Sequence, residues 1–229
     1  MLDESYNSKN SLLNLNQGLW MLLDNAQTSL DQINSDLKDV EERREKLIKG
    51  TRDVISLCSK AIVAMHHDQM QKAEMNMHQA KTMLDEFRQY SRTDLYKYVS
   101  VAEQEIVEAY SLKSVIQSSA IPSMKDLNVS GPSYITGLLD CIGEMKRMVY
   151  DRMRAGRGQD AAKLFSLMQD IYSSVYPFAV YDHLISGMRR KLDVAKMLIE
   201  DIRAVVTEET RRDELIKAID NLERKLNGH

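Results

Sequence analysis

Apolar residues recur at intervals of three and four over most of this chain, the spacing of one buried face of an α-helix. The longest series begins near residue 35 and predicts a long amphipathic helix. It consists of Leu37, Val40, Leu47, Val54, Ile55, Cys58, Ile62 and Met65. A shorter apolar group around Trp20 predicts a short helix over 11–30. We therefore divide the chain into an N-terminal extension, residues 1–34, and a helical domain, residues 35–229.

Further periodic segments predict the rest of the helical domain. They cover residues 69–90, 94–117, 133–154, 160–176, 181–206 and a last helix near 215–226. Proline and glycine separate several of them, most clearly in the loop at 118–132 and the break at 155–158. No stretch alternates apolar and polar residues in the way that a strand does. The sequence predicts an all-α, single-domain bundle of about seven helices.

Composition fits this interpretation and narrows the function. Of the 229 residues, 43% are hydrophobic and 28% charged, with only 9 Gly and 3 Pro, which suits one helical domain with a substantial core. The formal net charge of -3 argues against a protein that coats nucleic acid through a global positive field. No apolar run reaches the roughly 18 residues of a membrane span, and Cys58 and Cys141 lack the spacing of a disulfide framework. We expect a cytoplasmic protein with reduced thiols and no membrane contact.

Two pairs of carboxylates stand out on the predicted helices. Glu105 and Glu108 are three residues apart, and Asp140 and Glu144 are four apart, so each pair shares one face of its helix. Gly137, on the edge of the second face, would let another helix or a ligand approach closely. If the two faces met, four carboxylates would converge, and grouped carboxylate oxygens are ligands that Mg²⁺ prefers. The pattern therefore predicts a site for Mg²⁺, with Mn²⁺ as a second acceptable cation.

Each of these observations also has a structural explanation. Acid pairs at such spacing are common in a chain this charged, and either pair alone is more often a partly solvated structural pair. The adjacent His66 and His67 point in different directions, which favours packing roles over metal binding. Arg147 could hold a substrate phosphate or form an ordinary ion pair with Glu144. The chain has no glycine-rich phosphate loop, Ser/His/Asp order or CxxC pair, so covalent catalysis has no candidate.

The carboxylate motifs resemble those of translin and its partner, translin-associated factor X. Residues 104–109, Gln-Glu-Ile-Val-Glu-Ala, are similar to the Gln-Glu-Tyr-Val-Glu-Ala stretch of the factor X branch. Asp140 with residues 143–147, Gly-Glu-Met-Lys-Arg, resembles that branch's Ala-Asp-Leu-Thr-Gly-Glu-Leu-Met-Arg stretch. Weaker support comes from residues 45–53, 171–172 and 191–194. The chain is most similar to the catalytic branch, in its archaeal-type single-subunit form.

This resemblance implies an all-α fold of seven helices that assembles with itself into a closed, hollow oligomer, a hexamer to octamer. It also implies binding of single-stranded RNA or DNA and a Mg²⁺-dependent endoribonuclease activity. Acids matching Glu105, Glu108 and Asp140 act in that activity, and Glu144 would complete the metal shell or orient a water. All four are therefore expected to be both metal ligands and catalytic residues, and the resemblance implies no organic cofactor.

Candidate phosphate contacts are fewer than the resemblance would suggest. Lys97 precedes Glu108 by almost three helical turns and so lies on nearly the same side of its helix. Arg147 and Arg52 are the other candidates for nucleic-acid binding. The basic and aromatic run that precedes this helix in translin is reduced here to residues 96–98, Tyr-Lys-Tyr.

Three functions stay open on the sequence. The leading one is a metal-dependent endoribonuclease that cleaves single-stranded RNA inside a homo-oligomer. The alternatives are a non-catalytic RNA- or DNA-binding oligomer like translin and a helical scaffold protein. Retention of Asp140 favours the nuclease, because binding alone does not require an acid at that position.

Overall fold

The structure is a computed structural model that describes the backbone of residues 4–92 and 94–227 and the side chains of residues 23–92 and 94–226. The described residues form six α-helices and one 3₁₀ helix, without a strand. In chain order they are α1 (Glu4–His66), α2 (Met70–Ser91), α3 (Lys97–Gln117), α4 (Gly131–Arg154), α5 (Gly158–Val175), η1 (Tyr176–Tyr181) and α6 (Met188–Asn227). The predicted all-α class and single-domain bundle are therefore confirmed.

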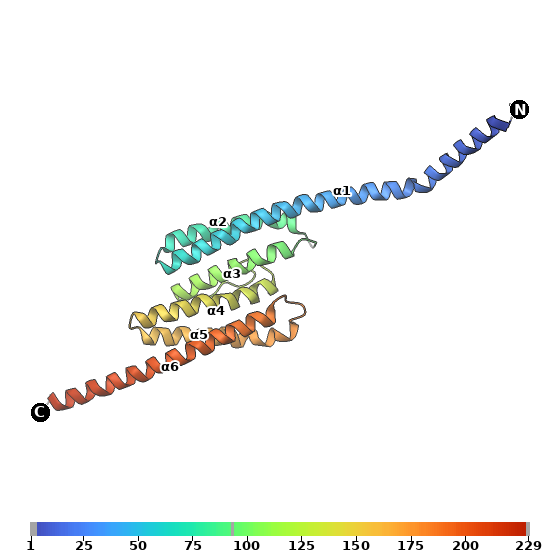
Figure 1. Ribbon diagram of the computed structural model, residues 1–229. Coiled ribbons are helices and arrows are strands. Elements are labelled where there is room, and N and C mark those ends of the chain that lie inside the picture. The colour runs from blue at the N-terminus through green and yellow to red at the C-terminus, as the bar shows by residue number, and fades with distance from the viewer. Residues whose placement is uncertain (1–3, 93, 228–229) are drawn as a thin grey trace.

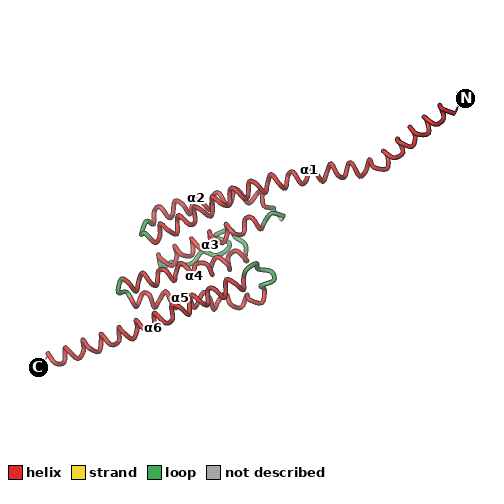
Figure 2. Tube along the Cα trace, viewed as in Figure 1, coloured by secondary structure: helices red, strands yellow, loops and turns green. Residues whose placement is uncertain are grey.

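The helices pack side by side in nearly their chain order, joined by short connections (Figures 1 and 2). α1 packs on α2 and α3, α3 on α4, and α4 on both α5 and α6. Residues from all six helices share one continuous apolar core. Its largest fully buried side chains include Leu47, Met77, Ile106, Ile142, Met168 and Ile202. α3 and α4, which carry the four candidate acids, therefore occupy the middle of the bundle.

Both ends of the chain form longer helices than the sequence pattern indicates. The short helix expected over 11–30 is part of α1, and the helices expected over 181–206 and 215–226 are one helix, α6, that begins only at Met188. The physical reason is that neither 19–49 nor 189–227 contains a glycine or proline to end a helix. The N-terminal part of α1 and the C-terminal part of α6 extend beyond the other helices in opposite directions (Figure 1). The domain boundary at residue 34 stays a prediction, and the side chain of Trp20 lies outside the described residues.

A buried carboxylate, Glu103, fixes the start of α4 against α2 and α3. It is 3% exposed and accepts hydrogen bonds from the backbone N–H (3.1 Å) and hydroxyl (3.0 Å) of Ser130. The Tyr96 hydroxyl (2.6 Å) and the Arg88 guanidinium (3.2 Å) also donate to it. Ser130 in turn caps α4, because its hydroxyl accepts from the backbone N–H of Ser133. This network sets where α4 begins and hence which of its residues face α3.

Candidate carboxylate site

The two acid-bearing helices approach closely at Gly137. A Cβ atom at this position would lie 2.6 Å from the Val107 Cβ and 2.7 Å from the Gln104 carbonyl oxygen. Only a residue without a side chain allows this backbone contact. Gln104 and Val107 each directly precede one of the acids of α3, and Asp140 lies one turn beyond Gly137. The glycine contact therefore brings the acids of α3 beside those of α4, as the sequence analysis anticipated for a close helix neighbour.

The four carboxylates lie close enough to affect one another's ionisation. Burial raises the pKa of Glu105, and the charge of Asp140 adds to the effect. Burial also raises the pKa of Glu108 to about 8, with further contributions from Glu105, Asp140 and Glu144. Like charges gathered in a poorly solvated position favour the protonated form. The structure thus places all four predicted acids in one cluster, which we call the carboxylate cluster.

The acids of α4 have cationic or protonatable partners. Lys191 Nζ lies 2.5 Å from both carboxylate oxygens of Asp140. His66 Nε2 lies 2.5 Å from Glu144 Oε2, and the imidazole side chain is only 3% exposed. In the described part of the chain, Glu105 and Glu108 form no side-chain hydrogen bond or ion pair. The α3 acids therefore have no direct hydrogen-bond or ion-pair partner there, and Lys191 acts on them only as a nearby charge that lowers their pKa.

This donor set fits a hard divalent cation chemically. All four groups offer carboxylate oxygens, and their crowding raises the energy of the ionised state in a way that a bound cation would relieve. Among the described residues, however, no three His, Cys, Asp or Glu side chains are close enough together to hold one metal ion in this arrangement. Lys191 and His66 engage Asp140 and Glu144, so metal binding would require these contacts to rearrange.

Lys191 and His66 are the two members of the site that the sequence does not identify. Lys191 lies in a weakly similar segment, 191–194, and nothing there indicates that it contacts Asp140, 51 residues away. His66 was assigned to packing because of its neighbour His67, but it bonds Glu144 across 78 residues. Helical spacing relates residues three and four apart, and it carries no information about such distant pairs.

The predicted basic residues have different surroundings. Arg147 is exposed, and the expected alternative of an ion pair with Glu144 is wrong, because Glu144 bonds His66 instead. Lys97 is exposed at the start of α3, with its ammonium 5.2 Å from the centre of the Tyr98 ring. Arg52 is exposed on α1. Within the described residues, neither Lys97 nor Arg52 contacts the carboxylate cluster, so their predicted phosphate contacts stay predictions.

The cysteines and the hydropathy of the helices agree with the sequence analysis. Cys58 and Cys141 are buried and free, and burial raises the pKa of both thiols. Neither has the exposed, electropositive surroundings of a reactive thiol. Across the described residues, every helix is too short or too polar to cross a membrane.

Fold and site together define a class: an all-α bundle with a partly buried carboxylate cluster between its third and fourth helices. Residues 42–208 match the model of the Translin family. The chain therefore belongs to the Translin family, as the motifs around Glu105 and Asp140 suggested. The assignment to the catalytic branch of the family stays a prediction.

Relatives agree with this placement. The crystal structure of AfC3PO superposes with a TM-score of 0.74 at 27% identity, and the structure of an AfC3PO–duplex RNA complex with a TM-score of 0.73 at 26% identity. Each match covers 80% of this chain and 97% of the other. Apo-NeC3PO, at 20% identity and a TM-score of 0.71, covers 79% and 96% and shares the fold. The uncharacterized protein MJ0175 of Methanocaldococcus jannaschii is 27% identical over 178 residues, 76% of this chain and 80% of its own length.

Proposed function

We propose that this protein is a Mg²⁺-dependent endoribonuclease that binds and cleaves single-stranded RNA within a closed homo-oligomer. The observation that carries the proposal is the convergence of two acids of α3 with two of α4, which the close helix contact at Gly137 produces. Burial and the three neighbouring carboxylates raise the pKa of Glu108 to about 8 there. A structural role does not account for four acids held together at this energetic cost, because fewer would serve it. Perturbed carboxylates of this kind are typical of functional sites. Membership of the Translin family and the RNA complex of AfC3PO support RNA as the ligand.

Glu105, Glu108, Asp140 and Glu144 would hold the cation, with Mn²⁺ as a substitute for Mg²⁺. A bound divalent cation supplies Lewis-acid polarisation and neutralises negative charge that develops on the phosphate. The four carboxylates would position it and would also repel a phosphate that arrived without it.

Lys191 and His66 have separate tasks in this proposal. Lys191, whose ammonium group now contacts Asp140, would hold a phosphate oxygen of the substrate. His66 Nε2 bonds Glu144 Oε2, and its imidazole would be free to exchange a proton with the substrate once that carboxylate turned to the cation. His66 is therefore the candidate to protonate the leaving oxygen.

The alternative is a non-catalytic RNA-binding oligomer. It is favoured by the Lys191–Asp140 contact, which neutralises one of the acids without any metal. In that case the carboxylate cluster would have no catalytic role, and RNA binding would depend on basic groups elsewhere on the chain. Helical scaffolding without any nucleic-acid role is the third possibility and predicts neither binding nor cleavage.

The test incubates labelled single-stranded RNA with the purified full chain in Mg²⁺ or in EDTA, with duplex RNA in parallel. Asp140→Asn and Glu108→Gln each remove one carboxyl group as a metal ligand, and Asp170→Asn, at an exposed acid of α5, is the matched control. We expect Mg²⁺-dependent cleavage by the unmodified protein and by Asp170→Asn, and none by the two site variants. Binding without cleavage would move the protein to the non-catalytic class, and light scattering would report the number of subunits.

A further inference from the structure

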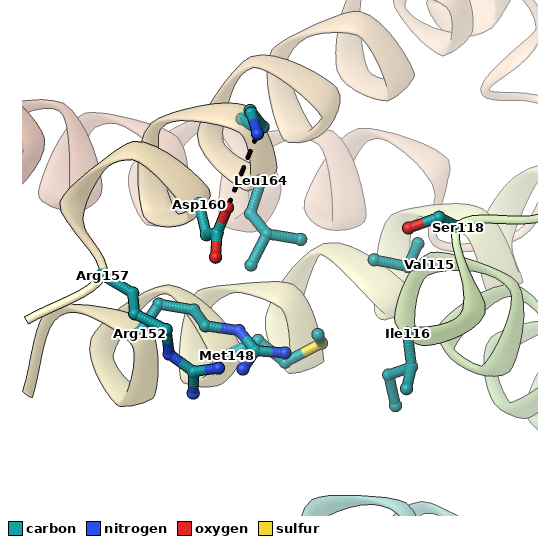
Figure 3. A pocket seen from close by; sticks show the side chains of 9 residues that line it. Val115, Ile116, Ser118, Met148, Arg152, Arg157, Asp160 and Leu164 are labelled. Carbon is teal, nitrogen blue, oxygen red and sulfur yellow. Dashed lines mark ion pairs between the residues drawn. The ribbon is translucent and has the colours of Figure 1, made fainter. Parts of the chain in front are cut away.

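Two adjoining cavities lie at one end of the bundle, beside the carboxylate cluster. Their volumes are about 290 Å³ and about 300 Å³. They share Ile116, Met148, Arg152 and Arg157, so they are two parts of one depression. The ends of α3 and α4 meet the start of α5 there, as Figure 3 shows for the first cavity. We call this depression the arginine groove.

Three arginines line the groove without being neutralised. Arg147 lines one cavity, and Arg152 and Arg157 line both. Within the described residues none of the three forms an ion pair with an acid. Of the acids nearby, Asp151 pairs with Arg154, and Asp160 pairs with Lys163 at 3.5 Å, which leaves Asp68 at the edge. In a chain of net charge -3, this is a local surplus of guanidinium groups suited to an anion.

The helix α5 starts at the groove. It begins at Gly158, directly after Arg157, and no side chain caps its first turn by a hydrogen bond. The N–H groups at the start of a helix carry partial positive charge and accept anionic ligands. Asp160 in the first turn and the Asp213 carboxylate beside Gly158 already offset part of this charge, so the preference for an anion rests on the arginines.

Apolar side chains lie between the charged groups of the groove. Figure 3 shows Met148 beside Arg152 on α4, Leu164 on α5, and Ile116 on α3 across the cavity. An inorganic anion would use only the guanidinium groups. A nucleotide would use both features, because its phosphate pairs with arginine while its base lies against apolar side chains and guanidinium planes. The combination favours a single-stranded nucleic acid, whose bases are free to make such contacts.

One residue joins the groove to the carboxylate cluster. His66 lines the second cavity and bonds Glu144 at 2.5 Å. A strand lying in the groove would therefore run directly up to the acids. We propose that the arginine groove binds the nucleotides of a single-stranded RNA that flank the reacting phosphodiester. Arg152 and Arg157 hold the phosphates, and the half-buried Ile116 and Leu164 support a base. This inference rests on the proposed function for the position of the reacting bond, although its binding step can be tested alone.

The experiment measures fluorescence anisotropy of a labelled single-stranded oligoribonucleotide added to the full chain in EDTA, where metal-dependent cleavage cannot occur. The test variant is Arg152→Ala/Arg157→Ala. The control is Arg203→Ala, which removes an exposed arginine of α6 that is paired with Glu200, and neither of these two residues lines the cavities. We expect binding at least about tenfold weaker for the double variant and unchanged for the control.

Salt dependence and a conservative variant complete the test. Loss of two phosphate contacts should reduce the slope of log affinity against log salt by about 1.4 for a single strand. Arg152→Lys/Arg157→Lys should restore part of the affinity, because the charge remains although the planar fork is lost. Circular dichroism of each variant checks the fold, which these exposed and half-exposed side chains do not support.

Failure of this inference is distinguishable from failure of the proposed function. Equal loss in the double variant and in Arg203→Ala, or no loss in either, would overturn the groove proposal, as would an unmodified protein that does not bind the oligonucleotide. Weak binding by the double variant alone supports the groove whether or not the unmodified protein cleaves RNA in Mg²⁺. Cleavage by the unmodified protein together with full binding by the double variant would support the nuclease function and refute RNA binding in the groove.

Discussion

Replacing Gly137 by alanine should separate the two acid-bearing helices. The new methyl group would lie 2.6 Å from the Val107 Cβ and 2.7 Å from the Gln104 carbonyl oxygen. Carbon atoms in good contact are about 3.5–4.0 Å apart, so α3 and α4 must move apart locally by roughly 1 Å. The carbonyl belongs to the backbone of a helix and cannot rotate away, so no side-chain adjustment relieves the contact.

The magnitude follows from two opposing effects. Overpacking of this kind costs about 1–3 kcal/mol, and we take the upper end because the backbone is involved. Alanine also favours the helix over glycine by about 1 kcal/mol. The net loss in the free energy of unfolding for Gly137→Ala is therefore about 2 kcal/mol, which corresponds to a fall in Tm of about 4–8 °C in a chain of this size.

Gly143→Ala is the matched control in the same helix. The nearest atom to its new methyl group, Leu198 Cδ1, is 4.0 Å away, an ordinary contact. Only the helix-propensity gain applies there, so this variant should be more stable by about 1 kcal/mol. Thermal unfolding of both variants, followed by circular dichroism at one protein concentration to hold any self-association constant, measures the difference.

The reasoning would be refuted by a Gly137→Ala protein as stable as the unmodified chain, or by equal changes in the two variants. Either result would mean that α3 and α4 do not touch at Gly137. Separation of the helices should also weaken the mutual effect of the carboxylates. Stabilisation by Mg²⁺ should therefore decrease in Gly137→Ala and persist in Gly143→Ala.

Three further predictions concern the charged residues around the cluster. Because the folded state holds the Glu108 proton up to about pH 8, against an ordinary pKa of 4.5, the free energy of unfolding should fall as pH rises between these values. Glu108→Gln should remove this dependence and be more stable than the unmodified protein by on the order of 2 kcal/mol at pH 8.5, after a discount for partial exposure. Parallel urea titrations at pH 5.5 and 8.5 would refute this if the variant differed from the unmodified protein equally at both pH values. Lys191→Met removes the cation that lowers the pKa of Glu105 and Glu108, so it should lower Tm at pH 8, and an unchanged Tm would place Lys191 away from the cluster. Glu103→Gln leaves Arg88 without its buried acceptor charge and should cost about 2–4 kcal/mol in chemical denaturation, whereas the exposed Asp170→Asn should cost almost nothing.

The sequence by itself determined the helical class and the choice of acids. Spacings of three and four residues follow from the local geometry of a helix, so the pattern alone places Glu105 with Glu108 and Asp140 with Glu144. A glycine on the edge of an apolar face likewise indicates close approach, and Gly137 does contact α3. Helix ends were less predictable, because the absence of glycine and proline lets α1 and α6 continue past the points where their apolar faces weaken.

Only the tertiary structure decided which groups meet. The contacts of Lys191 with Asp140 and of His66 with Glu144 join residues 51 and 78 positions apart, and no local spacing encodes them. The same holds for Glu103, whose role depends on a serine in the following loop. Burial and the proximity of other carboxylates, which together raise the pKa of Glu108, exist only once α3 and α4 are packed together. Local geometry sets which side chains share a face of a helix, and packing across the bundle sets which residues that face contacts.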